Sequence, residues 1–320
     1  GAEAGMVTTG SAGGILLSCA ACRTGADPQR MKALPRAEGG KDEFVMQQAH
    51  RIGFDHAVGV AGGRIVEAGT EGATRPEQIE AALSERTAAV LHVVLDPQPV
   101  VPLKQVVEIA CARGVPVIVD AAAEVPPAQN LSAFVEAGGD LGIFSGGKDI
   151  AGPNDTGILC GRSDLIAAAR AQSFPNGGIG RPLKVSKEQI VGLVFALRRF
   201  KALDEAERMG RWRTQAESIA ARLVGLKGVE VDIAHPTHGA RPLVIPRARL
   251  RIDEDLLGCT VGQIETELEQ GQPAVAVLPE PAQATIWINP QHLQDGEEAI
   301  VARRLVEVLE SKIRHGQGEA

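Results

Sequence analysis

The chain has 320 residues, of which 44% are hydrophobic and 23% charged, and its formal net charge is −7. This length predicts one large or two medium domains with a substantial core, and the acidic balance argues against a protein that binds nucleic acid through a broad basic surface. Because no apolar run is long enough to cross a bilayer, we expect the cytoplasm as its location.

The first residues predict a strand that leads into a helix. The chain begins at Gly1 in a run typical of the middle of a domain, so we expect a further N-terminal segment to precede it. Val7 to Gly13 supplies a strand and a turn with small hydroxyl residues. Ala12 to Cys22 continues as a helix-like run of small residues.

Five cysteines are an odd number, which rules out a full disulfide framework. Cys19 and Cys22 form a CxxC pair, a spacing also found in redox and zinc sites. No second pair or nearby histidine completes a zinc set, so we interpret both as buried small hydrophobic residues. His235 and His238, in the sequence HPTH, have no supporting carboxylate or cysteine spacing and are read as loop residues. We therefore expect no metal site.

Short β-rich runs alternate with amphipathic helical stretches up to about Arg170. The helical stretches include Pro76–Ser84 and Leu103–Arg113, and the second is followed by the helix-stopping Gly114. Such alternation predicts a mostly parallel sheet with helices on both faces. The expected strands are Phe44–Met46, Arg64–Glu67, Ala88–Val94, Pro116–Val119, Leu141–Phe144 and Gly157–Cys160.

The pattern changes after residue 185. Ser186 to Leu226 predicts a nearly continuous helix, with Gly210 as a candidate break. We therefore expect a large α/β domain over residues 1–185, and a long connecting helix with a smaller α+β domain over residues 186–320. The later elements expected are strands at Val229–Ile233, Leu243–Ile252, Ala274–Val277 and Ala284–Ile288, and helices at Val261–Glu269 and Glu297–Ile313.

The run PVIVDAAAEVPP, Pro116 to Pro127, holds the first candidate site residue. A β-branched stretch suited to a buried parallel strand ends at Asp120. Ligands of open α/β sheets bind at the carboxyl ends of the strands, so Asp120 stands where such a sheet presents functional groups. Taken alone, it is equally well read as a cap of the following turn.

A second strand, in LGIFSGGKDIAGP, ends in Ser145, two glycines and Lys148. The glycines allow close approach of the backbone, and Ser145 adds a hydroxyl beside exposed backbone donors. A lysine after a core strand can be a partly buried amine with a lowered pKa, as a Schiff base requires, although a lone lysine is more often simply solvated. The glycine spacing is wrong for a Walker A loop.

Together the two sites suit pyridoxal phosphate. The aspartate would keep the pyridine nitrogen protonated, and the lysine would bind the cofactor and later transfer protons. FSGGKDIAGPNDTGILCGRSDLI resembles the cofactor-lysine segment of the bacterial selenocysteine synthase-like family, and PVIVDAAAEVPP resembles the aspartate strand of its D-glucosaminate-6-phosphate ammonia-lyase branch. The resemblance covers most of the chain, including GRPLKVSKEQIVGL at Gly180–Leu193.

The resemblance implies a fold-type I pyridoxal-phosphate enzyme of the α/β class, with Lys148 and Asp120 as its catalytic residues. It implies a phosphate cradle at the helix N-terminus, where backbone donors bind anions. The residues implied for the cradle are Gly10, Ser11 and Ala12, with Ser145 as a further donor. An ordinary Gly/Ser turn is the alternative reading of this segment.

Several further positions follow from the same resemblance. His50 holds the position of the ring that stacks on the pyridine face, with His56 as the reserve candidate, although a lone histidine is more often structural. Asp96 lies where the fold reaches the cofactor's ring hydroxyl or the substrate; it equally suits a turn before Pro97.

Arg181, Lys184 and Lys187 form a basic cluster that would bind a carboxylate and a phosphate of the substrate. A solvated start of the long helix is the alternative. The chain departs from the family at Asn154-Asp155, where a glutamine commonly follows the proline.

The implied function is a pyridoxal-phosphate-dependent lyase that releases ammonia from a hydroxylated or phosphorylated 2-amino acid such as D-glucosaminate 6-phosphate. Selenium transfer to seryl-tRNA is a second reading, which the net charge opposes. Transamination and aldol cleavage use the same cofactor. A truncated, inactive remnant is a third reading. The family also implies a homodimer or a larger even-numbered assembly.

Overall fold

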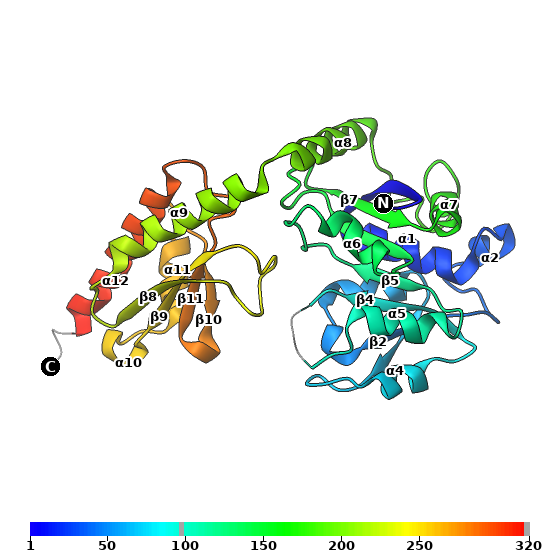
Figure 1. Ribbon diagram of the computed structural model, residues 1–320, viewed down its shortest axis with the longest axis horizontal. Helices are drawn as coiled ribbons and strands as arrows, with labels where there is room; N and C mark the ends of the chain where they lie inside the picture. Colours follow the sequence, from blue (N-terminus) through cyan, green and yellow to red (C-terminus); the bar gives the residue numbers. More distant parts are fainter. Residues whose placement is uncertain (96–98, 317–320) are drawn as a thin grey trace. The chain divides into compact units, whose positions relative to one another are not determined.

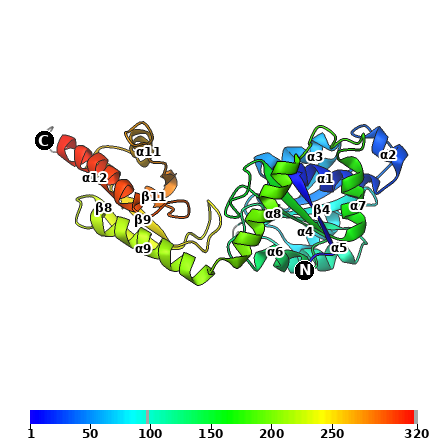
Figure 2. The same ribbon diagram turned by 90° about the horizontal axis from the view of Figure 1, so that it is seen from above.

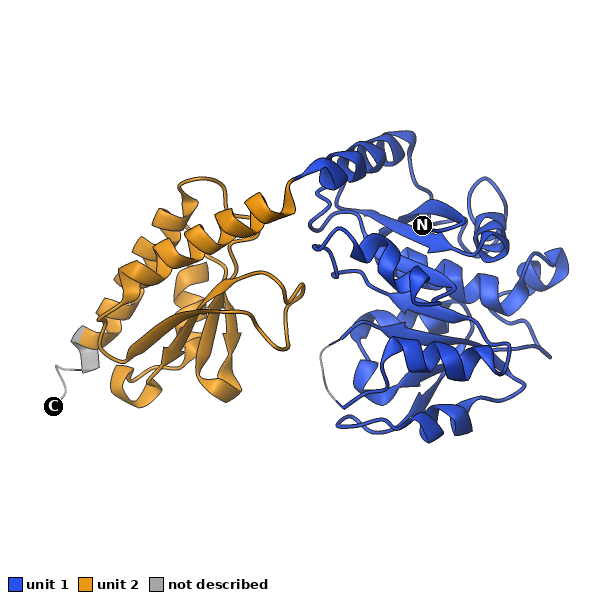
Figure 3. Ribbon diagram, viewed as in Figure 1, with its two compact units in different colours: residues 1–203 blue, residues 204–320 orange. Residues whose placement is uncertain are grey.

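The computed structural model describes residues 1–95 and 99–316. The chain forms two compact units, Gly1–Leu203 and Asp204–Ala320 (Figure 3). Among the described residues, no helix combines the length and the apolar character that a membrane span requires.

The first unit is built on a seven-stranded sheet (Figure 1). β7 runs antiparallel to both of its neighbours, and the other adjacent strands are parallel. The six strands expected from the sequence all form, each within one residue at either end. In spatial order the strands are β1 (Ala4–Thr9), β7 (Thr156–Gly161), β6 (Leu141–Ser145), β5 (Val117–Asp120), β4 (Thr87–Val93), β2 (Glu43–Gln47) and β3 (Arg64–Ala68).

Helices cover both faces of this sheet (Figure 2), which is why β2, β4 and β5 are buried along their whole length. One face packs against α1 (Gly10–Thr24), α3 (His56–Val60) and α7 (Ser163–Gln172). The other packs against α4 (Pro76–Ala82), α5 (Leu103–Cys111), α6 (Asn130–Glu136) and α8 (Lys187–Ala202). The short elements are α2 (Pro28–Ala33), η1 (Gln48–His50) and η2 (Gly53–Asp55).

The small residues of α1 let it lie close to the sheet. A Cβ added at Gly14 would stand 2.9 Å from Cγ2 of Ile143 on β6. Cys19 lies in the core as expected, Cys22 packs at its margin, and both thiols are free. This close packing brings the N-terminus of α1 to the carboxyl edge of the sheet.

The helix expected over residues 186–226 is two helices, α8 and α9 (Glu205–Leu223). The break falls at Leu203-Asp204 and not at Gly210, which lies inside α9. The Asp204 carboxylate accepts a hydrogen bond from Glu207 N–H at 3.0 Å and so starts a new helix. As a result α8 belongs to the first unit, whereas the sequence groups it with the C-terminal domain.

The second unit has a four-stranded antiparallel sheet with one buried face. Along β9, Ala248, Leu250 and Ile252 point into the core, while Arg249 pairs with Asp232 of β8. The strands, in spatial order, are β10 (Leu278–Glu280), β11 (Thr285–Ile288), β9 (Arg247–Ile252) and β8 (Val229–Ala234). The helices besides α9 are α10 (Glu254–Leu257), α11 (Val261–Glu269), α12 (Glu297–Gly316) and the short η3 (Pro281–Gln283).

Two predicted strands of this unit differ from the structure. The strand expected at Ala274–Val277 is wrong: Val275 N–H donates to Leu268 C=O at the end of α11, and strand structure begins only at Leu278. The strand expected from Leu243 begins at Arg247, because Pro242 and Pro246 lack the N–H that a ladder needs.

Candidate active site

Three sequence-predicted segments meet at the carboxyl edge of the large sheet. Asp120 pairs in register with Ile143, so it shares a face with Ser145 two residues further along β6. Thr8 of β1 and Ser145 both pair with Gly157 of β7. The ends of β1, β5 and β6 therefore lie together, and α1 begins at the same edge.

Asp120 is a buried carboxylate, only 5% exposed. Burial raises its pKa, whereas a hydrogen bond from Ala122 N–H at 3.1 Å and the positive charge of Lys148 act in the opposite direction. Asp120 is the last residue of β5 and Lys148 follows the end of the adjacent strand β6, so both come from neighbouring strand ends. A cationic ring nitrogen beside Asp120 would favour its ionised form, which is the partnership that pyridoxal phosphate offers.

Lys148 stands on a tightly closed loop between β6 and β7. Gly146 N–H donates to Thr156 C=O, and Gly152 N–H donates to Gly146 C=O, both at 2.8 Å. Gly147 is required for space, since a Cβ there would stand 2.5 Å from the Cα of Asn154. The lysine expected to be partly buried is exposed, because its neighbours Asp149 and Ile150 occupy the buried positions of the loop.

The N-terminus of α1 is suited to an anion. Its first turn contains no acidic residue, and Thr9 at the N-cap does not cap the helix, because its hydroxyl donates to Leu183 C=O at 3.0 Å. Gly10 N–H donates to Asp155 C=O, and the Ser11 and Ala12 amides of the first turn have no hydrogen-bond partner within residues 1–95 and 99–316. A phosphate is one of the anions that such a turn binds.

Two buried histidines lie beside each other near this edge. His50, in η1 after β2, is 1% exposed, and His92 on β4 is 7% exposed. Their ring centroids are 4.7 Å apart and their planes meet at 87°. Burial lowers the pKa of His50 to about 4; burial and then His50 lower the pKa of His92 to about 3. Both rings are therefore neutral at neutral pH.

His56, the reserve candidate, is exposed at the start of α3. His92 was not singled out from the sequence, although a histidine inside the apolar run Ala88–Val94 was a signal for it. Asp96 lies outside the described residues and stays a prediction.

The predicted substrate cations gather around an exposed aromatic ring. Arg181 and Lys184 each stand 4.6 Å from the centroid of Phe174. Their loop touches the start of α1 through the Thr9–Leu183 hydrogen bond. Lys187, the third member, is exposed at the first position of α8.

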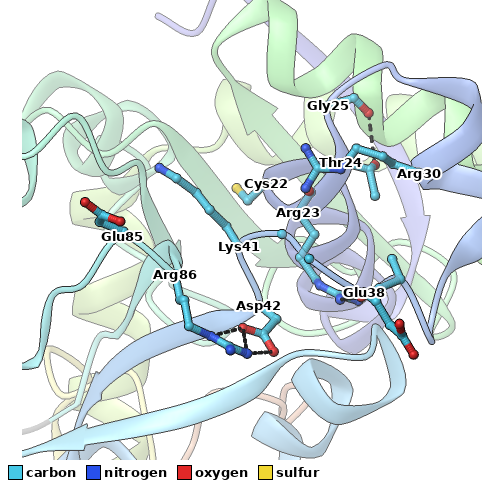
Figure 4. A pocket seen from close by; sticks show the side chains of 13 residues that line it. Cys22, Arg23, Thr24, Gly25, Arg30, Glu38, Lys41, Asp42, Glu85 and Arg86 are labelled. Carbon is cyan, nitrogen blue, oxygen red and sulfur yellow. Dashed lines mark hydrogen bonds and ion pairs between the residues drawn. The ribbon is translucent and has the colours of Figure 1, made fainter.

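A separate cavity of about 880 Å³ lies by the residues that precede β2 and β4, at the opposite edge (Figure 4). Asp42 and Arg86 pair there at 2.7 Å. Arg23 donates hydrogen bonds to the carbonyls of Ala61, Pro35 and Ala37. The described lining includes none of the predicted site residues.

The donor set at the carboxyl edge fits pyridoxal phosphate. It combines first-turn helix amides for a phosphate, a buried carboxylate for a ring nitrogen and a lysine for a covalent link. The fold and these residues define a pyridoxal-phosphate-dependent enzyme of fold type I.

Comparison with known proteins gives the family. The sequence pattern of the DegT/DnrJ/EryC1/StrS aminotransferase family matches residues 36–248, and the chain belongs to this family. A 5'-C-glycyluridine monooxygenase-decarboxylase of a Streptomyces species is 35% identical over 97% of this chain and 77% of that protein. A D-glucosaminate-6-phosphate ammonia lyase of Salmonella typhimurium is 32% identical over 97% of this chain and 82% of that protein.

A solved structure of D-glucosaminate-6-phosphate ammonia-lyase has a TM-score of 0.81 and 31% identity, over 97% of this chain and 82% of that chain. An L-seryl-tRNA(Sec) selenium transferase of Moorella thermoacetica is 25% identical over 99% of this chain and 70% of that protein. The resemblance inferred from the sequence is confirmed. The chain is a pyridoxal-phosphate-dependent enzyme, and its relatives support the lyase type.

Proposed function

We propose that the enzyme eliminates ammonia from a hydroxylated or phosphorylated 2-amino acid such as D-glucosaminate 6-phosphate. The observation that carries the proposal is the meeting of Asp120, Lys148 and the unpaired first turn of α1 at one edge of the sheet. The likeness to an ammonia lyase over nearly the whole chain supports the choice of reaction.

Each residue has a separate task in this proposal. Pyridoxal phosphate, when bound, supplies an electron sink for negative charge at the substrate Cα. Asp120 holds a proton at the ring nitrogen, and Nζ of Lys148 binds the cofactor and then accepts the Cα proton. The amides of Ser11 and Ala12 bind the cofactor phosphate, with the hydroxyl of Ser145 as a further donor. His50 covers the ring.

The remaining steps occur on the substrate. The Cα proton and the β-hydroxyl are lost as water, and the enamine that results is hydrolysed to a 2-keto acid and ammonia. Arg181 and Lys184 would bind the substrate's carboxylate or phosphate, because both are exposed cations beside the start of α1. Asp96 stays a candidate for contact with the ring hydroxyl or the substrate.

We also propose that the enzyme is a cytoplasmic homodimer or a larger even-numbered assembly. Four large apolar side chains lie exposed along α8, at Ile190, Val191, Val194 and Phe195. Apolar groups gathered on one helix are typical of protein–protein contacts. The proposed phosphorylated substrate supports the cytoplasmic location, because a phosphorylated molecule does not cross a membrane unaided.

The first experiment tests the covalent link. The protein is incubated with pyridoxal phosphate, reduced with borohydride and digested, and the cofactor is located by mass spectrometry. We expect a single adduct at Lys148, and none in Lys148→Ala. An adduct elsewhere, with Lys148 unmodified, would remove the proposed mechanism.

The second experiment tests the reaction. D-Glucosaminate 6-phosphate and D-glucosaminate are supplied separately, and ammonia and keto acid are measured. We expect equal amounts of both products, with at least about a hundredfold loss in Lys148→Ala. A parallel assay with 5'-C-glycyluridine measures oxygen uptake and carbon dioxide, because a relative with 35% identity carries that name. Activity there alone, or salt-sensitive binding of tRNA, would contradict ammonia release.

A further inference from the structure

His92 is a buried histidine for which the proposed function has no task. It is the sixth residue of β4, the strand that lies between β5 and β2. Val90, two residues earlier, and Val119, its partner on β5, share an apolar cluster on the same face of the sheet. An imidazole is therefore an unusual choice at this position.

The buried imidazole of His92 lowers the stability of the fold. Nδ1 of His92 is buried and has no hydrogen-bond partner within residues 1–95 and 99–316. A buried polar atom without a partner lowers stability, whereas an apolar side chain of similar size would not. Sequences keep such costs mainly where the side chain serves the function.

The neighbouring His50 needs a means of fixing its ring. Nδ1 of His50 is likewise buried without a hydrogen-bond partner among the described residues, so no bond through that atom sets the ring's rotation. Its edge-to-face contact with His92, at 4.7 Å and 87°, does constrain the rotation. Burial keeps both rings neutral, which avoids repulsion against a protonated pyridine ring.

We infer that His92 is a positioning residue that holds the His50 ring in the orientation needed to cover the pyridine face of the cofactor. The inference rests on the proposed function, in which His50 is the covering ring. His92 acts through His50 and makes no contact with the substrate.

The test measures cofactor binding in the full chain. The dissociation constant for pyridoxal phosphate and the visible circular dichroism per bound cofactor are determined for His92→Leu and His92→Phe. Leucine removes the ring, so we expect about two- to tenfold weaker binding and a reduced dichroism. Phenylalanine keeps the ring and should restore both. His292→Leu, at an exposed histidine of the second unit, is the matched control and should leave both unchanged.

A double-mutant cycle separates positioning from general loss of packing. In a His50→Leu background, replacing His92 by leucine should change the dissociation constant less than twofold, because the ring it orients is already gone. An undiminished effect in that background would overturn the inference. So would wild-type binding and dichroism in His92→Leu.

Failure of the proposed function is recognised separately. If borohydride fixes the cofactor on Lys148 of the wild-type chain, the cofactor site stands, and the results for His92 judge this inference alone. If no adduct forms at Lys148, the proposed function fails first, and the inference fails with it.

Discussion

At the scale of single residues, Asp120 shows how burial and function oppose each other. Its carboxylate is buried and its pKa is raised, so the ionised form lowers the stability of the folded chain. Such a group stabilises the fold fully only below its unfolded pKa, and this contribution is lost as the pH rises through the folded pKa. The cofactor's positive ring nitrogen is the compensation that the proposed function provides.

Replacing Asp120 with asparagine should therefore have opposite effects on stability and activity. The cofactor-free variant should unfold at a higher temperature than wild type at pH 7, and the difference should vanish near pH 4. Ammonia release should fall by on the order of a hundredfold, because the ring nitrogen loses its negative partner. Thermal unfolding at several pH values, together with the ammonia assay, measures both. A variant that is less stable at pH 7 would contradict this account.

The two histidines predict a pH dependence of the opposite sign. Their folded pKa values, about 4 for His50 and about 3 for His92, lie below the unfolded value of 6.5. The stability that depends on the neutral rings is complete above pH 6.5 and is lost as the pH falls toward the folded values. Between pH 6.5 and pH 4, the free energy of unfolding of the wild type should fall by about 3 kcal/mol more than that of His92→Phe. Denaturant unfolding of the cofactor-free proteins at several pH values tests this. If the free energy of unfolding changed with pH by the same amount in both proteins, the prediction would be contradicted.

Some features of the candidate site can be predicted from the sequence and others cannot, for physical reasons. Asp120 and Lys148 are recognisable because the first ends a buried apolar strand and the second closely follows another, where a polar group is conspicuous. The contact of Arg181 and Lys184 with Phe174 depends on the path of an irregular loop, which no periodic pattern encodes. The exposure of Lys148 likewise depends on which loop neighbours turn inward.

At the scale of elements, the loop that carries Lys148 depends on glycine. A Cβ at Gly147 would stand 2.5 Å from Cα and 2.7 Å from the carbonyl oxygen of Asn154, and both are backbone atoms that cannot rotate away. Gly59, inside α3, has no such neighbour within 4 Å.

Gly147→Ala should therefore destabilise the chain by about 1–3 kcal/mol and weaken cofactor binding, because the loop must move. Gly59→Ala is the matched control and should be neutral or slightly stabilising in its helix. Denaturant unfolding and a pyridoxal-phosphate titration of both variants provide the comparison. Equal behaviour of the two would show that the loop tolerates displacement.

Strands were easier to predict than the break between α8 and α9. The strands β2, β4 and β5 are mostly apolar and buried along their whole length, because both faces of their sheet are covered. In the long helical stretch, Gly210 suggested a break because glycine is a poor helix former. The carboxylate of Asp204 was the stronger signal, since it caps a new helix.

At the scale of the whole molecule, the proposed assembly depends on the apolar surface of α8. Val191 is 68% exposed on that helix, while Val224, at the end of α9, is 71% exposed without such neighbours on its own helix. The two valines are almost equally exposed, but only Val191 has exposed apolar neighbours on its helix. Val224 is therefore a matched control for Val191.

Val191→Glu should shift the protein toward the monomer, because a charge would be buried at the interface, whereas Val224→Glu should keep the wild-type assembly. Light scattering after gel filtration measures the mass of each. A wild-type monomer, or an unchanged assembly in Val191→Glu, would remove α8 from the proposed interface.

The reversed direction of β7 has a consequence for how the enzyme tolerates change. The start of β7 and the residue before it are bonded to two other strand ends at once: Gly157 pairs with Thr8 and with Ser145, and Asp155 C=O accepts a hydrogen bond from Gly10 N–H. A displacement of this segment would move the proposed phosphate-binding end of β1 and the proposed ring-binding end of β6 in the same direction, so the distance between them would change little. We therefore expect substitutions there to shift the cofactor as a rigid body, and not to stretch its site.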